Sequence, residues 1–178
     1  MADNGHADYI SEVEELYKQE DVYLAEAKTK TPITMLANLS RAVQPGSSTG
    51  KTDPTNYRWF DMKFIDSPGV KSQAFKCSVK SHDSETGHRL IMAFYDVAPG
   101  EKPNSDVNAV RVNCSCLSYY FYFGYYNWSN DCHYGPKPRA YQKVPGSNRG
   151  SVNPTNSPGT CKHLNAFARL LQDSGKIK

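Results

Sequence analysis

The chain has 178 residues, of which 38% are hydrophobic, with five cysteines and a formal net charge of +3. That length supports one domain with a real core and is short for two. The odd cysteine count, the polar N-terminal segment and the lack of a membrane-length apolar run argue against a disulfide-bonded secreted scaffold or a membrane protein. We therefore expect a protein made in the cytoplasm with reduced thiols.

Charge is distributed unevenly along the chain. Residues 1–26 carry eight acids and one base, whereas the remainder carries ten acids and twenty bases. No acid lies between Cys132 and Gln172, and the bases in that interval are Lys137, Arg139, Lys143, Arg149, Lys162 and Arg169. Such polarity is typical of chains that meet other chains or nucleic acid, although any single charge can simply be solvated.

The first part of the chain predicts two helices. Residues 8–28 form an amphipathic pattern in which apolar side chains recur at helical spacing from Ile10 to Leu24. Thr31 and Pro32 predict the start of a second helix, with Thr31 as N-cap and Pro32 at the first helical position.

After a loop rich in Gly, Ser, Pro and Thr, the apolar period changes to two, which predicts strands. The expected strands span residues 57–65, 74–80, 88–97 and 107–116. The second and third read as a hairpin closed by a polar turn. We expect an α+β fold, with an antiparallel sheet of about four or five strands between helices at the two ends of the chain.

Two pairs of metal-type ligands stand far apart in the sequence. Cys114 and Cys116 form a C-x-C pair on a predicted strand, where residues i and i+2 share a face. Cys161 and His163 form a C-x-H pair at the start of a predicted C-terminal helix, for which Thr160 is the expected N-cap. Three thiols and one imidazole are a ligand set that structural Zn²⁺ prefers, so we predict a zinc site joining sheet and helix.

Other cysteine assignments stay open at this point. The cysteines can be reduced core residues, since free cysteine is among the most buried residue types. Cys132 and His133 offer a competing pair that can replace one of the four ligands. Cys77, and Cys132 if it is not a ligand, can be free or can pair with each other.

The C-x-C and C-x-H pairs resemble the SWIM-type zinc finger, in which the second pair begins a helix. The resemblance covers roughly residues 111–173 and rests on the four ligand positions. Here 44 residues separate Cys116 from Cys161, a longer interval than is usual in that family. The resemblance implies a structural zinc ion, with the insertion looping out between the ligand pairs.

The insertion combines an aromatic run with a polar arm. Residues 119–128 hold eight aromatics in ten positions; as a strand, this run would present one aromatic face to the core and the other to a partner. Residues 129–160 predict an extended arm or long loop. The candidate interface residues are Tyr120, Tyr122, Tyr125, Tyr126, Trp128, Lys137, Arg139, Lys143 and Arg149.

Signals for catalysis are weak. Residues 46–52 imitate a phosphate-binding loop, but they have the wrong spacing and follow a helix instead of a strand. His82, Asp83, Glu85 and His88 gather in the predicted hairpin turn, where polar residues are ordinary. We expect no enzymatic activity and no small-molecule substrate.

The C-terminal third also resembles small virion proteins of large tailed bacteriophages, through the Cys114–Cys116 segment, the aromatic run and residues 153–164. This resemblance implies a structural component of a capsid, neck, tail or baseplate, made in the host cytoplasm and partnered by other subunits. The alternative is a zinc-dependent module that binds single-stranded nucleic acid. We treat residues 1–178 as one domain, with a helical region (1–43), a sheet (57–128), an arm (129–160) and a C-terminal helix (161–173).

Overall fold

The computed structural model describes residues 4–24, 31–43, 50–140 and 152–178. Four antiparallel strands form one sheet in the order β1-β2-β3-β4. The strands are β1 (Tyr57–Ser67), β2 (Ser72–Ser81), β3 (Gly87–Phe94) and β4 (Val110–Cys114). The predicted α+β class and sheet are confirmed, with strand ends shifted by a few residues.

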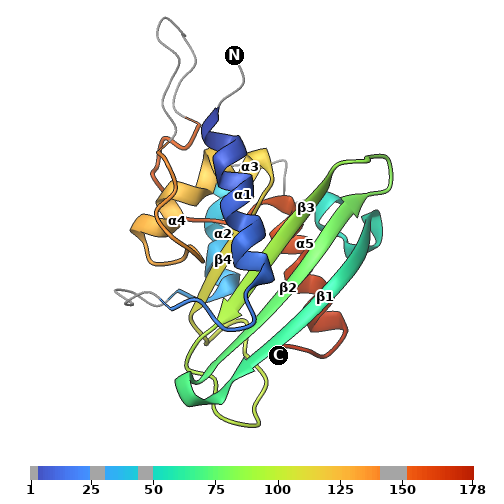
Figure 1. The fold of residues 1–178 in the computed structure, drawn as a ribbon, viewed down its shortest axis with the longest axis vertical. Helices are drawn as coiled ribbons and strands as arrows, with labels where there is room; N and C mark the ends of the chain where they lie inside the picture. The colour runs from blue at the N-terminus through green and yellow to red at the C-terminus, as the bar shows by residue number, and fades with distance from the viewer. Residues whose placement is uncertain (1–3, 25–30, 44–49, 141–151) are drawn as a thin grey trace, which may run out of the picture.

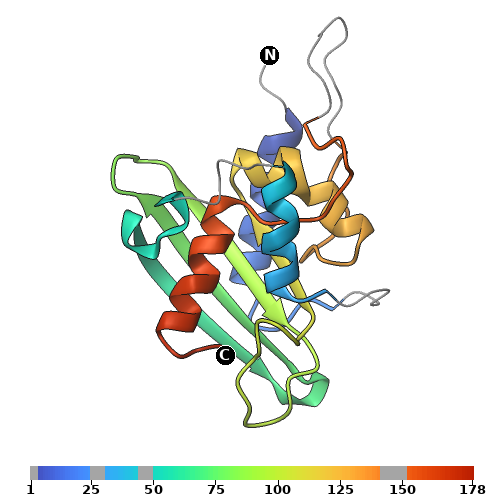
Figure 2. The same cartoon turned by 180° about the vertical axis from the view of Figure 1, so that it is seen from behind.

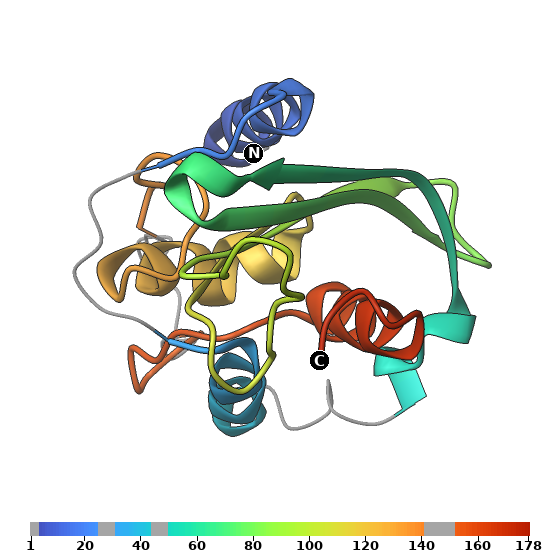
Figure 3. The same ribbon diagram turned by 90° about the horizontal axis from the view of Figure 1, so that it is seen from below.

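Helices cover both faces of the sheet. Helix α1 (Asn4–Lys18) lies on one face, and α5 (Lys162–Asp173) lies on the other, as Figures 1 and 3 show. Helix α2 (Ile33–Val43) stands beside α5. Short 3₁₀ turns, η2 (Gly50–Thr52) and η3 (Pro54–Asn56), lead into β1, and η4 (Pro68–Val70) joins β1 to β2.

The predicted first helix is wrong at both ends. It begins at Asn4 and ends at Lys18, so Leu24 lies outside it and is half exposed. The ammonium group of Lys76 on β2 donates to the carbonyl oxygens of Leu16 (2.6 Å) and Gln19 (2.8 Å). These bonds satisfy carbonyls that a helix end leaves without partners, so the chain leaves the helix there.

The second helix begins later than its sequence predicts. The main-chain carbonyl of Pro32 accepts from the amide of Leu36, and the helix itself starts at Ile33. Pro32 also bridges to Ala109 next to β4, which places it just before the helix instead of at its first position.

The aromatic run is helical and not a strand. It forms α3 (Leu117–Tyr119), a π-helical turn η5 (Tyr120–Gly124) and α4 (Tyr125–Ser129). The sulfur of Cys116 accepts from the amide of Tyr119 at 3.3 Å and so caps the start of this segment. Residues 117–129 therefore do not extend the sheet.

The main core lies mostly between the sheet and the helices on the α5 side, and Tyr9 and Val13 of α1 also belong to it. It includes Leu164, Phe167 and Leu171 of α5, together with Tyr119 and Phe123 of the aromatic segment, all less than 2% exposed. A smaller cluster under α1 joins Leu16 and Ile91 to Tyr134. Because the aromatic helices share the core with α5, they stand beside the start of that helix.

Candidate metal centre

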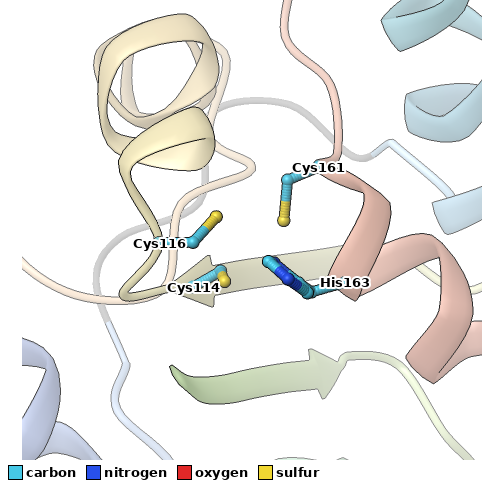
Figure 4. A group of neighbouring side chains, drawn as sticks. All are labelled: Cys114, Cys116, Cys161 and His163. Atoms are coloured by element: carbon cyan, nitrogen blue, oxygen red, sulfur yellow. The ribbon is translucent and has the colours of Figure 1, made fainter. Parts of the chain in front are cut away.

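The two ligand pairs predicted from the sequence meet in space. Cys114 ends β4, Cys116 follows it, and Cys161 and His163 lie at the start of α5 (Figure 4). One potential ligand atom from each of the four side chains lies within 4.8 Å of the others, and all four residues are buried. The predicted Cys₃His group is therefore present.

The turn between the first two cysteines is fixed by β3. The amide of Ser115 donates to the carbonyl of Arg89 at 3.1 Å, and the amide of Arg89 donates to the Ser115 hydroxyl at 2.9 Å. These reciprocal bonds hold the C-x-C segment against the sheet while both thiols turn toward α5. In this way the sheet positions half of the ligand set.

The second pair is positioned by the beginning of α5. Cys161 is the N-cap residue, with extended backbone angles (φ −76°, ψ 169°), so the predicted N-cap role of Thr160 is wrong. The Thr160 hydroxyl instead bonds to Asn165 Oδ1 at 2.5 Å. His163 lies in the first turn, where its ring packs edge-on against Tyr57 at 5.5 Å between centroids. Local helix geometry thus directs Cys161 and His163 to the same point.

The donor set fits a divalent metal ion. A tetrahedral zinc ion with Zn–S bonds of about 2.3 Å holds its sulfurs about 3.8 Å apart, which is compatible with the observed clustering. His163 Nδ1 is buried and has no hydrogen-bond partner among the described residues, so a metal ion bound there would satisfy it.

Burial and mutual contact set the protonation of the thiols. Burial raises the pKa of Cys114 and of Cys161 well above its usual value. Burial also opposes ionisation of Cys116, but hydrogen bonds from Cys114, Cys161 and His163 outweigh it and lower the pKa of Cys116. The cluster therefore favours one thiolate by itself, and a divalent cation would favour all three.

One side of the cluster borders the surface. Cys116 and His163, 3% and 6% exposed, line a cavity of about 310 Å³ that also touches His6 and His88. The His88 ring lies 4.8 Å from that of His163, and burial followed by the neighbouring His163 lowers the pKa of His88. His88 lies on β3 and not in the hairpin turn that was expected to hold it with His82, Asp83 and Glu85. Its position beside His163 could not be read from the sequence.

The competing pair lies apart from the ligand group. Cys132 Sγ contacts the Asn130 carbonyl at 3.2 Å, and His133 Nδ1 bonds to the Tyr119 hydroxyl at 3.0 Å. Neither residue belongs to the four-residue group. All five cysteines are described and buried, and none forms a disulfide in the structure.

The candidate interface residues are only partly gathered on the surface. Tyr120 is 5% exposed and belongs to the core, so it does not lie with the other candidates on the surface of the chain. The half-buried residues are Tyr122, Tyr125, Tyr126 and Trp128, and the exposed bases are Lys137 and Arg139. Lys143 and Arg149 lie outside the described residues. The Lys137 ammonium stands over the Trp128 ring at 4.6 Å.

The far end of the predicted arm is packed against the aromatic segment. Asn153 is fully buried, and its side-chain amide donates to the carbonyls of Tyr122 and Ser157, both at 2.8 Å. This part of the arm leads directly to the second ligand pair.

No protein-family model, curated protein or solved structure matches this chain. None of the helices in the described residues is both long and apolar enough to cross a membrane.

Proposed function

We propose that the chain is a non-enzymatic structural protein, stabilised by one Zn²⁺ ion and built into a larger assembly as a virion component of a tailed bacteriophage. The observation that carries the zinc assignment is the buried Cys₃His group. Four protein ligands leave no open coordination position for a substrate, which is typical of structural and not of catalytic zinc. The ion would tie β4 to α5.

An assembly role is supported by the uneven charge and by the exposed apolar side chains. Met62, Phe64 and Val107 are 47%, 56% and 71% exposed. The acidic start of the chain and its basic second half provide complementary surfaces for neighbouring subunits. The virion part of the proposal rests on the resemblance of the C-terminal third to small phage virion proteins.

The zinc part of the proposal is tested by elemental mass spectrometry with a free-thiol count on the same sample. We expect about one zinc per chain, with Cys77 and Cys132 the only thiols that can be titrated while the protein is folded and zinc-loaded. Metal-free, fully folded protein with five reactive thiols would contradict the assignment.

The assembly part is tested by tagging the chain in cells infected with its source virus. The tagged chain should co-sediment with particles on a density gradient. Replacement of the exposed acids of the N-terminal segment, Asp8, Glu15, Glu20 and Asp21, by their amides should prevent its incorporation, while the isolated variant still melts cooperatively. Particles that lack the wild-type chain would contradict the virion role.

A second candidate function is binding of single-stranded nucleic acid. The observation that favours it is the position of Lys137 beside Trp128 and Tyr125, since aromatic rings stack on bases and cations neutralise phosphates. Fluorescence anisotropy with a labelled oligothymidine should then show binding that weakens steeply with salt and is lost in Trp128→Ala. No binding at low salt would exclude this candidate.

A further inference from the structure

Strand β1 leaves one edge of the sheet open. It pairs with β2 on its inner side, and no other strand of the described residues pairs with its outer side (Figure 1). At the opposite edge, Val112 of β4 bridges to His133. An outer edge carries unpaired main-chain donors and acceptors, so β1 is the place where another strand can be added.

The middle of β1 is apolar and exposed. Phe60, Met62 and Phe64 are 40%, 47% and 56% exposed. The register with β2 shifts between Phe60 and Lys63, and Asp61 has a positive φ of 52°. Such a bulge blocks edge pairing locally. From Lys63 to Ser67 the pairing with β2 is uninterrupted, so the outer edge of this stretch is regular enough to pair with an added strand.

A groove beside this regular stretch is lined by residues of β1, β2 and α5. Figure 2 shows α5 over this face of the sheet. The volume of the groove is about 660 Å³, within the range of sites that bind ligands. The Phe64 ring packs against Phe75 with centroids 5.1 Å apart. The apolar residues that line the groove are Met62, Phe64, Phe75, Leu170 and Leu171. It can therefore receive apolar side chains projecting from a strand added to β1.

The rim of the groove is positively charged. Lys102 and Lys176 line it, and neither forms an ion pair within the part of the chain that the structure describes. The one acid on the rim, Glu101, is paired with the ammonium group of Lys178 at 3.0 Å. The unpaired charges on this rim thus favour an acidic partner.

We propose that the edge of β1 and its groove bind an extended, acidic segment of another subunit, with apolar side chains at alternate positions. Main-chain bonds to residues 63–67 provide affinity, the groove accepts every second side chain, and the two lysines select acidic residues. This inference rests on the proposed assembly role and names the surface that serves it.

The test uses zinc-loaded full-length protein and an immobilised array of nine-residue peptides that alternate apolar residues with either acidic or basic ones. We expect acidic peptides to bind and Phe64→Asp to weaken binding at least tenfold. Val107→Asp, a matched change at an exposed apolar residue outside the groove, should leave binding unchanged. Amide hydrogen exchange should show added protection within residues 63–67 on binding.

Several outcomes would overturn this site. These are equal binding of basic peptides, no binding of either set, or protection that excludes residues 63–67. Binding of dodecanoate to the groove without amide protection would indicate an amphiphile site instead. A concentration-dependent dimer that Phe64→Asp abolishes would assign the edge to a second copy of the chain. Because zinc content and particle association are measured separately, loss of peptide binding alone leaves the proposed function standing.

Discussion

The side chain of Asn127 forms a reciprocal hydrogen-bonded pair with the main chain of Gly159. Its Nδ2 donates to the Gly159 carbonyl at 2.8 Å, and the Gly159 amide donates to its Oδ1 at 2.7 Å. The same Nδ2 also donates to the Tyr119 hydroxyl at 3.0 Å. One amide therefore fixes the approach to Cys161 against the aromatic helices, across 32 positions of sequence.

Asn127→Ala should loosen the second ligand pair. It leaves the buried main-chain groups of Gly159 without partners, at a cost of about 3 kcal/mol in the free energy of unfolding. Loss of such a supporting contact typically weakens metal binding about 10-fold to 100-fold. Chemical denaturation and competition with a zinc chelator measure the two effects; unchanged zinc affinity would mean that the pair does not support the site.

Gly159→Ala should disturb the same segment through its packing and not through its hydrogen bonds. A Cβ at this position would lie 2.6 Å from Phe123 Cε1 and 2.9 Å from the Ser40 Cβ, which is closer than carbon atoms approach. We expect a loss of about 1–3 kcal/mol from overpacking. Gly69→Ala is the matched control, since nothing lies within 4 Å of its added Cβ. Equal melting temperatures for the two variants would contradict the close packing.

The four ligand residues could be predicted because the sequence spacing within each pair determines that both side chains point to the same side. A C-x-C pair at a strand end and a C-x-H pair at a helix start each direct two donors to one side. The strands could also be predicted from their period of two. The residues that hold the ligands in place could not be predicted, because their hydrogen bonds join positions with no fixed sequence spacing. These residues are Asn127 for the second pair and Ser115 for the first.

The sequence of the aromatic run suggests a strand because its β-propensity is strong and no helical period is visible. Tyr, Phe and Trp favour strands, and eight of them in ten positions dominate any local reading. In the structure the buried positions 119, 120, 123 and 127 recur at helical spacing. The sequence does not mark them, because aromatic residues fill almost the whole run and position 127 is an asparagine. The Cys116 sulfur cap and the Asn127 bonds supply the tertiary support for that helix.

Replacing Cys114 or Cys161 with Ser should unfold the C-terminal half. Structural zinc contributes on the order of 10 kcal/mol to small sites, which is comparable to the whole stability of a domain. Circular dichroism melting and zinc content measure this. Cys77→Ala is the matched control, since that buried thiol lies outside the cluster and should keep full zinc content. Unchanged melting temperatures of the Cys114 and Cys161 variants would contradict the zinc assignment.

Lys76→Met should release the end of α1. The ammonium group is fully buried and donates to the carbonyls of Leu16 and Gln19. A methionine fills the space but leaves both carbonyls unpaired, at a cost of about 2 kcal/mol. Amide exchange should become faster in residues 4–18, while zinc content stays the same. Unaltered exchange there would show that apolar packing alone holds the helix.

The wild type and Lys76→Met also test how the protonation of Lys76 affects the free energy of unfolding. Burial, followed by the neighbouring charge of Lys63, lowers the pKa of Lys76 from 10.5 to about 8. Between these values the unfolded chain binds a proton that the folded chain does not, so raising the pH favours the folded state. The free energy of unfolding of the wild type, relative to Lys76→Met, should therefore be constant below about pH 7 and rise from pH 8 to 10. Urea denaturation of both proteins at matched pH values measures this difference, and the comparison cancels the titration of tyrosines and thiols common to both. A difference that falls with rising pH would mean that the folded state holds Lys76 charged more strongly than water does.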